Sequence, residues 1–257
     1  MSLQQMHFGG RDMVETAIDR IREFCPPEGY YVAFSGGKDS IVIKDLVKRA
    51  GVPYDLHFQL TTVDPPELLS YIRQHHPDVA WHRPRETMWQ IIVRKRMPPT
   101  RPKRYCCREL KEYAGEGRLV VTGIRWDESD KRRQRRMLET CRKIHGKRLL
   151  NPIIDWTTAD VWQYIRENEL PYCRLYDEGF DRIGCIMCPM AEKRRHLDAE
   201  RWPQYKRAYI RAFQKMVDKR IADGLPTTWR TGEEVYTWWM QDPKTRTDEP
   251  EGCSLFE

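Results

Sequence analysis

The chain has 257 residues, of which 40% are hydrophobic and 32% are charged, and its formal net charge is +7. This composition excludes a disordered chain, and the length suits one large α/β domain with a small addition. No apolar run approaches the ~20 residues that span a bilayer, and the N-terminus lacks a signal-peptide pattern, so we expect a cytoplasmic protein without a membrane partner.

Strand and helix patterns alternate over most of the chain. The predicted strands are 30–34, 54–60, 79–81 and 119–124, followed by an extended segment at 149–154. Predicted helices cover 11–24, a segment after the glycine loop described below, 65–75, 86–96, and a segment through Val161, Tyr164 and Ile165. This alternation predicts an α/β fold with a doubly wound, mainly parallel sheet.

The pattern after Cys188 is helical only, with predicted helices at 199–222 and 232–240. We therefore divide the chain into a nucleotide-binding domain with a four-cysteine metal site, residues 1–190, and a helical C-terminal extension, residues 191–257. The positive net charge favours an anionic partner, and both nucleotide phosphates and nucleic acid fit that description.

A glycine loop joins the first predicted strand to the helix that follows it. Its sequence is Ser35-Gly36-Gly37-Lys38-Asp39-Ser40. Two glycines let backbone N–H groups turn toward one anion, the helix N-terminus adds positive potential, and Lys38 adds a full charge. The loop is not a Walker A motif, because Val32 stands where that motif needs glycine. The pattern predicts a pyrophosphate cradle rather than an ordinary turn.

Four cysteines occur as two pairs, Cys106-Cys107 and the Cys-x-x-Cys of Cys185 and Cys188. In a reducing compartment, paired cysteines are typical of metal or redox sites rather than disulfides. Zn²⁺ remains an alternative, but adjacent thiolates suit separate irons of a [4Fe–4S] cluster better than one tetrahedral ion.

The loop resembles the PP-loop of the N-type ATP pyrophosphatases, which split ATP between its α and β phosphates, usually with Mg²⁺. This resemblance implies that Ser35, Gly36, Gly37 and Ser40 bind the nucleotide, and that Lys38 and Asp39 both bind it and take part in catalysis.

The cysteine pairs resemble the cluster ligands of assimilatory adenylylsulfate (APS) reductases in the phosphoadenosine phosphosulfate (PAPS) reductase superfamily. The stretch from Gly123 to Arg132 resembles that family's nucleotide-binding stretch, and Thr61-Thr62 loosely resembles the turn after its second strand. The resemblance implies a catalytic role for Arg125 and Glu128. It implies nucleotide binding by Thr62, Gly123, Arg125, Ser129 and Arg132, and an adenine nucleotide alpha hydrolase-like fold.

Two departures separate the chain from the reductases. It keeps the ATP-type loop, and its C-terminal Cys253 does not stand in the reductases' Glu-Cys-Gly-Leu-His tail. An ATP-type loop combined with cluster-type cysteines is similar to DNA phosphorothioation subunits and cluster-dependent tRNA thiolation enzymes. We therefore expect an ATP pyrophosphatase that adenylates an acceptor for sulfur transfer, with a sulfur donor such as a cysteine desulfurase.

Two other functions stay open from the sequence. One is an APS or PAPS reductase that releases sulfite by way of Cys253 and a thiol donor, and the other is a nucleotide-binding regulatory protein with a structural metal site. Basic runs at 94–96, 101–104, 131–136 and 193–195 flank the nucleotide and cysteine motifs and are compatible with nucleic-acid contact or with solvated loops. Trp238 and Trp239 could stack bases, although their helical spacing is typical of a core.

Overall fold

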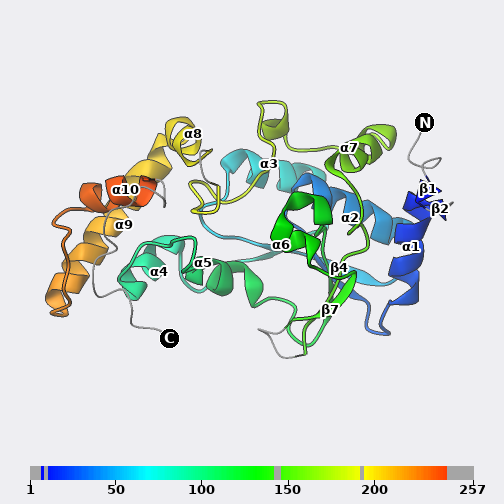
Figure 1. Ribbon diagram of the computed structural model, residues 1–257, viewed down its shortest axis with the longest axis horizontal. Coiled ribbons are helices and arrows are strands. Elements are labelled where there is room, and N and C mark those ends of the chain that lie inside the picture. The colour runs from blue at the N-terminus through cyan, green and yellow to red at the C-terminus, as the bar shows by residue number, and fades with distance from the viewer. Residues whose placement is uncertain (1–6, 9–10, 142–145, 192–193, 242–257) are drawn as a thin grey trace. The chain divides into compact units, whose positions relative to one another are not determined.

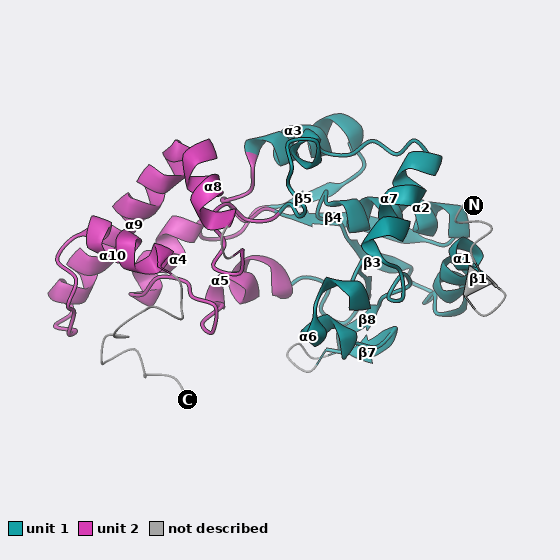
Figure 2. Ribbon diagram, turned by 45° about the horizontal axis from the view of Figure 1, so that its top comes forward, with its two compact units in different colours: residues 1–59, 66–82, 113–183 teal, residues 60–65, 83–112, 184–257 magenta. Residues whose placement is uncertain are grey.

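The computed structural model describes residues 7–8, 11–141, 146–191 and 194–241. The chain forms two compact units, each assembled from several stretches of sequence (Figure 2). Unit 1 comprises residues 1–59, 66–82 and 113–183, and unit 2 comprises residues 60–65, 83–112 and 184–257. The sequence division used a single boundary after residue 190, whereas the structure groups two earlier segments with the C-terminal helices.

Unit 1 is built on a six-stranded sheet with the strand order β5-β4-β3-β6-β8-β7. The strands are β3 (Tyr30–Ala33), β4 (Tyr54–Gln59), β5 (Ala80–His82), β6 (Leu119–Val121), β7 (Leu138–Thr140) and β8 (Arg148–Leu150). All neighbouring strands pair in parallel except β7, which runs antiparallel to β8 at one edge. Tyr30, Val32 and Val121 are fully buried, so β3 and β6 carry the centre of the core. A separate antiparallel pair is formed by β1 (His7–Phe8) and β2 (Arg11–Asp12).

The helices of unit 1 are α1 (Met13–Glu23), α2 (Lys38–Ala50), α3 (Pro66–His75), α6 (Asp130–Arg133) and α7 (Thr158–Glu167). Helix α1 begins where the Asp12 side chain accepts a 2.7 Å hydrogen bond from the Val14 N–H, as expected of an aspartate N-cap. Helix α2 ends at Gly51, whose left-handed backbone closes the last turn. Helix α2 packs against both α1 and α7 (Figure 1), which fixes the direction of its N-terminus.

Unit 2 is helical. Its helices are α4 (Met88–Lys95), α5 (Tyr105–Cys107), α8 (Arg194–Arg201), α9 (Pro203–Ala222) and α10 (Gly232–Met240), and a π-helical turn, Arg108–Glu112, follows α5. Helix α9 packs against α4, α8 and α10. Trp239 has no exposed surface and stacks against Tyr209 and Phe213, so a cluster of aromatic rings forms the core of this unit.

The predicted fold class is confirmed: the sheet is mainly parallel, helices pack around it, and the C-terminal region is helical. The predicted helix 199–222 is helical in the structure but is not continuous, because Pro203 has no N–H to continue α8 and instead starts α9. The suggested base stacking by Trp239 is wrong, because this side chain is buried in the core. None of the helices that the structure describes is long and apolar enough to cross a membrane.

Candidate functional site

The glycine loop lies between β3 and α2, at the carboxyl end of the central strand. Gly36 has φ +71°, and a Cβ atom there would lie 2.7 Å from Leu68 Cδ1 and 2.8 Å from Ile72 Cδ1. Gly37 is the N-cap of α2 and makes no side-chain cap hydrogen bond. The loop therefore requires glycine at position 36, and the N-cap residue itself places no side chain over the first turn of α2.

Internal hydrogen bonds hold the loop in shape. The Ser40 hydroxyl donates to the Gly37 carbonyl oxygen at 2.8 Å and accepts from the Ser35 N–H at 3.2 Å. The Lys38 N–H donates to the Tyr176 hydroxyl oxygen at 2.9 Å. Because backbone amides at a helix N-terminus bind anions, this conformation is preorganised for a phosphate group. In this conformation the Lys38 N–H is already satisfied by the Tyr176 hydroxyl.

Charged side chains at the start of α2 are paired rather than free. Lys38 is only 5% exposed, and its Nζ lies 3.2 Å from Asp39 Oδ2. Asp39 Oδ1 accepts a 2.7 Å hydrogen bond from Arg125 Nε. Both carboxylate oxygens of Asp39 are therefore occupied by cations, which places Asp39 as a bridge between Lys38 and Arg125.

Gly123 and Arg125 follow β6, the parallel neighbour of β3, so they reach the same edge of the sheet as the loop. A Cβ atom on Gly123 would lie 2.8 Å from the Asp39 Cβ and 3.0 Å from the Asp39 carbonyl carbon. Glycine at this position lets the segment after β6 approach α2 closely. Strand order reverses direction at β3, and ligands of open α/β sheets bind at such a point.

Arg125 is buried to 1% exposure and uses its whole guanidinium within unit 1. Besides Asp39, it donates to the Trp156 carbonyl oxygen at 3.2 Å and to the Thr158 hydroxyl at 3.3 Å. Its Nη1 also lies 3.5 Å from Asp127 Oδ2. The expected catalytic role of Arg125 stays a prediction, and this placement favours a residue that positions Asp39 rather than one that contacts substrate.

The residues after Arg125 form a short capped turn beside it. Glu128 Oε2 accepts a 3.0 Å hydrogen bond from the Arg125 N–H, and the Ser129 hydroxyl accepts from the Arg132 N–H at 3.3 Å. Burial lowers the pKa of Arg132, whose charge interacts with Glu128, Arg182, Arg135 and Asp39. The structure therefore brings Glu128, Ser129 and Arg132 close to the glycine loop and concentrates positive charge there.

Thr62 belongs to unit 2, unlike the other predicted nucleotide residues. Its backbone has φ +65°, and its hydroxyl accepts a 2.9 Å hydrogen bond from the Met88 N–H at the start of α4. This contact is structural. Nucleotide binding by Thr62 stays a prediction from the family resemblance.

All four predicted metal-binding cysteines belong to unit 2. Hydrogen bonding to Cys106, together with the cation of Arg104, lowers the pKa of Cys107 although burial opposes this. Cys106 also interacts electrostatically with Cys185 and Cys188, so the four thiols occupy one neighbourhood. The Arg104 Nη2 donates to Cys107 Sγ at 3.5 Å, and Cys185 Sγ lies 3.5 Å from the Thr61 hydroxyl.

These thiols are soft donors of the kind that Fe–S clusters need, and the charges of Arg104 and Lys111 beside them would offset the negative charge of thiolates. The negative charge of a Cys185 thiolate is the main cause that raises the pKa of Lys111. In the part of the chain that the structure describes, however, no group of three or more His, Cys, Asp or Glu side chains is arranged to hold a metal ion. The four-cysteine metal site therefore stays a prediction that rests on donor chemistry and spacing.

Comparison with known proteins identifies the family. Residues 29–191, more than half of the chain, match the phosphoadenosine phosphosulfate reductase domain. The chain belongs to this family.

Relatives of this PAPS reductase family member differ in length and in name. An uncharacterized protein of Methanocaldococcus jannaschii is 30% identical over 213 residues, which are 78% of this chain but 50% of that protein. A second M. jannaschii protein is 36% identical over 176 residues, which are 63% of this chain and 36% of the relative. The chain thus spans half or less of these two relatives. An adenosine 5'-phosphosulfate reductase of Oceanobacillus iheyensis is 29% identical over 176 residues, 61% of this chain and 69% of the reductase.

Solved structures support the fold. A PAPS reductase from Candida auris in a phosphate complex superposes with a TM-score of 0.53 at 21% identity, covering 70% of this chain and 97% of that one. A Candida glabrata FMN adenylyltransferase has a TM-score of 0.50 at 18% identity, covering 72% and 66% of the two chains. At these identities the likeness shows the family's fold and nothing about the substrate.

Several residues of the site in this family member were not predicted. Tyr176, Trp156 and Thr158 contact the loop or Arg125, and they come from segments to which the sequence analysis assigned no site residue. Asp127 also was not predicted, although its carboxylate accepts from the Thr158 N–H and hydroxyl. A short sequence motif shows the loop, but a residue more than a hundred positions away can complete it only through the fold.

Proposed function

We propose that this PAPS reductase family protein is an ATP pyrophosphatase that adenylates an acceptor for sulfur transfer. The observation that carries the proposal is the ATP-type loop itself, Ser35-Gly36-Gly37-Lys38-Asp39-Ser40, with its glycine-dependent turn at the N-terminus of α2. A loop of this kind holds the pyrophosphate that leaves when the α-phosphate of ATP is attacked. Because phosphoryl and nucleotidyl transfer depend mainly on positioning and charge neutralisation, such a loop supplies most of what the reaction needs.

Each charged residue has a role in this proposal. Loop amides and Lys38 bind the β and γ phosphates and neutralise the charge that develops on pyrophosphate. Asp39, held between Lys38 and Arg125, fixes the Lys38 ammonium at the entrance of α2. Arg132 adds positive charge beside the α-phosphate. Glu128 orients the Arg132 side chain through an ion pair in which Glu128 Oε2 lies 3.7 Å from Arg132 Nη1. Mg²⁺ would be held mainly by phosphate oxygens, because both Asp39 carboxylate oxygens are already paired.

The sulfur half of the reaction is assigned to unit 2. Cys106, Cys107, Cys185 and Cys188 would hold a [4Fe–4S] cluster, which supplies redox-active iron and sulfide when bound, with Zn²⁺ as the alternative occupant. A separate protein such as a cysteine desulfurase would provide the sulfur. Cys253, which the reductase hypothesis needs, lies outside the described residues.

A second candidate is an APS or PAPS reductase. It is favoured by the name of the Oceanobacillus relative, which is 29% identical over 61% of this chain. The ATP-type loop argues against this candidate, because a sulfonucleotide has no pyrophosphate to place in the cradle.

Product analysis separates the candidates. Anaerobically purified protein is incubated with Mg²⁺ and α-labelled ATP, or with ³⁵S-labelled APS and a thiol reductant that supplies the two electrons for sulfite release, and the products are resolved. AMP with pyrophosphate supports the proposal, sulfite supports the reductase, and nucleotide binding with neither product supports a regulatory protein. Lys38→Ala should abolish pyrophosphate release. Lys48→Ala, at an exposed lysine near the end of the same helix, is the matched control.

A further inference from the structure

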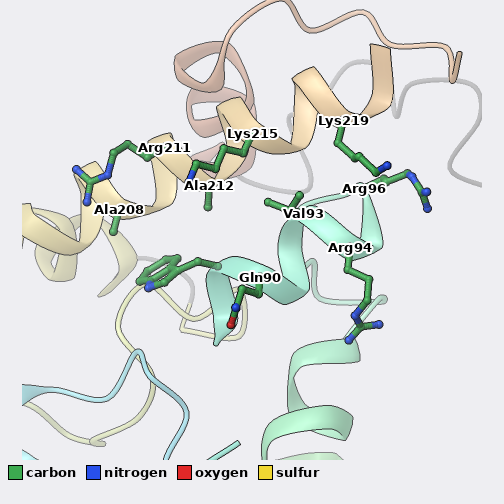
Figure 3. Close-up of a pocket in the computed structure, with 10 residues that line it drawn as sticks. Gln90, Val93, Arg94, Arg96, Ala208, Arg211, Ala212, Lys215 and Lys219 are labelled. Carbon is green, nitrogen blue, oxygen red and sulfur yellow. The ribbon is translucent and has the colours of Figure 1, made fainter. Parts of the chain in front are cut away.

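A groove of about 610 Å³ lies between α4 and α9 in unit 2 (Figure 3). This volume is in the range of ligand-binding clefts. Five of its ten lining residues are basic and none is acidic; the basic residues are Arg94, Arg96, Arg211, Lys215 and Lys219. Arg94 is paired with Glu86 and Glu109, so the uncompensated positive charge of the groove lies on the α9 side. The groove belongs to neither the glycine loop nor the cysteine pairs.

The floor of the groove is apolar and its rim is charged. Small side chains of Ala208 and Ala212 on α9 face Val93 and Trp89 on α4. In Figure 3 the side chains of Arg211, Lys215 and Lys219 extend from α9, and those of Arg94 and Arg96 extend from α4. An anion on the rim would thus have an apolar face below it.

Ion pairs and a buried arginine fix one end of the groove. Arg96 and Lys219 both contact the Asp223 carboxylate. The buried Arg220 donates a 2.8 Å hydrogen bond to the Arg96 carbonyl oxygen, which joins α9 to the end of α4. The two walls are therefore held together before any ligand binds.

Two cations remain available to a ligand. Arg211 and Lys215 are exposed, and among the described residues neither has a carboxylate within ion-pair distance. They lie four positions apart on α9, about 6 Å along the helix axis, and Lys219, which is paired with Asp223, continues the same row. A straight row of evenly spaced cations matches an extended polyanion, whereas a single phosphate would need cations that converge on one point.

The apolar floor favours bases over other polyanions. Trp89 is partly exposed, and its ring meets the Tyr209 ring edge to face at 4.8 Å, which holds the indole in place. A fixed and partly open indole beside a row of cations is the arrangement with which proteins bind single-stranded nucleic acid. An acidic amphipathic helix would instead need deep pockets for large apolar side chains, and here the floor on α9 consists of alanines.

We propose that the α4–α9 groove binds a short single-stranded segment of nucleic acid, with its phosphates on Arg211 and Lys215 and a base stacked on Trp89. The assignment of this strand as the acceptor rests on the proposed function, whereas the binding itself does not. Recognition follows the backbone and the faces of the bases, so it carries little sequence preference.

Fluorescence anisotropy with a labelled 12-nucleotide single-stranded RNA and DNA tests the proposal, with the full chain at two salt concentrations. We expect Arg211→Gln/Lys215→Gln to weaken binding at least about tenfold and to lower the salt slope by roughly 1.4, since each phosphate contact to a single strand contributes about 0.7. Trp89→Ala should weaken binding by about five- to a hundredfold. Lys206→Gln/Arg207→Gln, two exposed residues of the same helix outside the groove, is the matched control and should bind like the parent.

Several outcomes would overturn the proposal. They are the absence of strand binding at low salt, equal losses in the groove and control variants, tighter binding of a duplex of the same sequence, and equally tight binding of poly-glutamate. Lys38→Ala should leave strand binding unchanged. If no pyrophosphate is released but strand binding behaves as expected, the groove is confirmed as a nucleic-acid site and only the proposed ATP pyrophosphatase function is rejected. Thermal unfolding of each variant shows whether a loss of binding reflects a loss of fold.

Discussion

The hydroxyl oxygen of Tyr176 accepts a 2.9 Å hydrogen bond from the backbone N–H of Lys38, the first residue of α2. The Tyr176 ring is held in turn against Trp162 at 4.9 Å, edge to face. A residue from a distant segment thus satisfies the amide that the glycine loop would offer to a phosphate oxygen. Ligand binding must either displace this hydroxyl or use it as part of the site.

Tyr176→Phe separates these two roles. If the hydroxyl competes with phosphate for the Lys38 N–H, its removal should lower the Kd for ATP by about two- to tenfold, because one net hydrogen bond is worth about 0.5–1.5 kcal/mol. The ring and its packing remain. Titration calorimetry with a nonhydrolysable ATP analogue measures the change, and a weaker affinity would mean that the hydroxyl contacts the ligand.

The two glycines of the loop should respond differently to substitution. Gly36→Ala introduces a Cβ at φ +71° and within 2.9 Å of Leu68 and Ile72, so we expect nucleotide binding to be lost and the protein to be destabilised by about 1–3 kcal/mol. At Gly37 the nearest atoms would be 3.3–3.4 Å away and φ is negative, so Gly37→Ala should fold normally. Urea unfolding and nucleotide titration of both variants test the loop, and equal stability of the two would contradict the geometry.

Arg125 should stabilise the fold of unit 1 by joining Asp39 to the Trp156 carbonyl oxygen. Arg125→Ala would leave Asp39 and the Trp156 carbonyl without their buried partner, and we expect the free energy of unfolding to fall by about 3–5 kcal/mol. Arg125→Lys should recover little, because an ammonium cannot replace a fork that reaches both groups. Arg133→Ala, whose side chain is 72% exposed, is the control and should change stability by less than about 0.5 kcal/mol. Urea unfolding of all three measures the difference, and a normal Arg125→Ala midpoint would leave direct substrate contact as the better interpretation.

Local patterns predicted what depends on neighbouring residues. The turn at the glycine loop and the span of α10 both follow from a few adjacent side chains. The partners of Arg125 and Lys38 did not, because Asp39, Thr158 and Tyr176 meet only when β3, β6 and α7 are in place. The short β7 and α5 also escaped prediction, since three residues carry no readable periodicity. The sequence therefore predicted where the glycine loop turns into α2 but not the contacts that shape the loop.

The stability of unit 1 should depend on pH through His76. Burial, followed by the positive charge of Lys44, lowers the pKa of His76 to about 4. The unfolded chain, with a pKa near 6.5, therefore takes up the proton first, so stability is complete above about pH 6.5 and falls until about pH 4. The loss should reach roughly 1–3 kcal/mol once solvent screening is allowed for.

Urea midpoints measured from pH 7 to pH 4 test this dependence. His76→Gln keeps a polar side chain between Lys44 and Tyr71 and removes the titration, so its midpoints should vary less with pH. His75→Gln, at the exposed neighbouring position, should keep the parent's pH dependence. A parent and a His76→Gln variant with parallel pH profiles would show that His76 is accessible to protons in the folded state.

Iron content decides whether the cysteine pairs act together. Cys106 and Cys107 come from α5, and Cys185 and Cys188 from the segment before α8, yet the thiols influence one another electrostatically. If they hold one [4Fe–4S] cluster, anaerobically prepared protein should contain about four iron and four sulfide per chain. Cys185→Ser and Cys107→Ser should each lower that content sharply, because one lost ligand opens the cluster. Cys141→Ser changes a partly exposed cysteine of unit 1 and should retain the parent's iron.

A colourless preparation with about one zinc per chain would assign the thiols to Zn²⁺ instead. If neither metal is present at a stoichiometric level, the cysteine pairs are ordinary thiols.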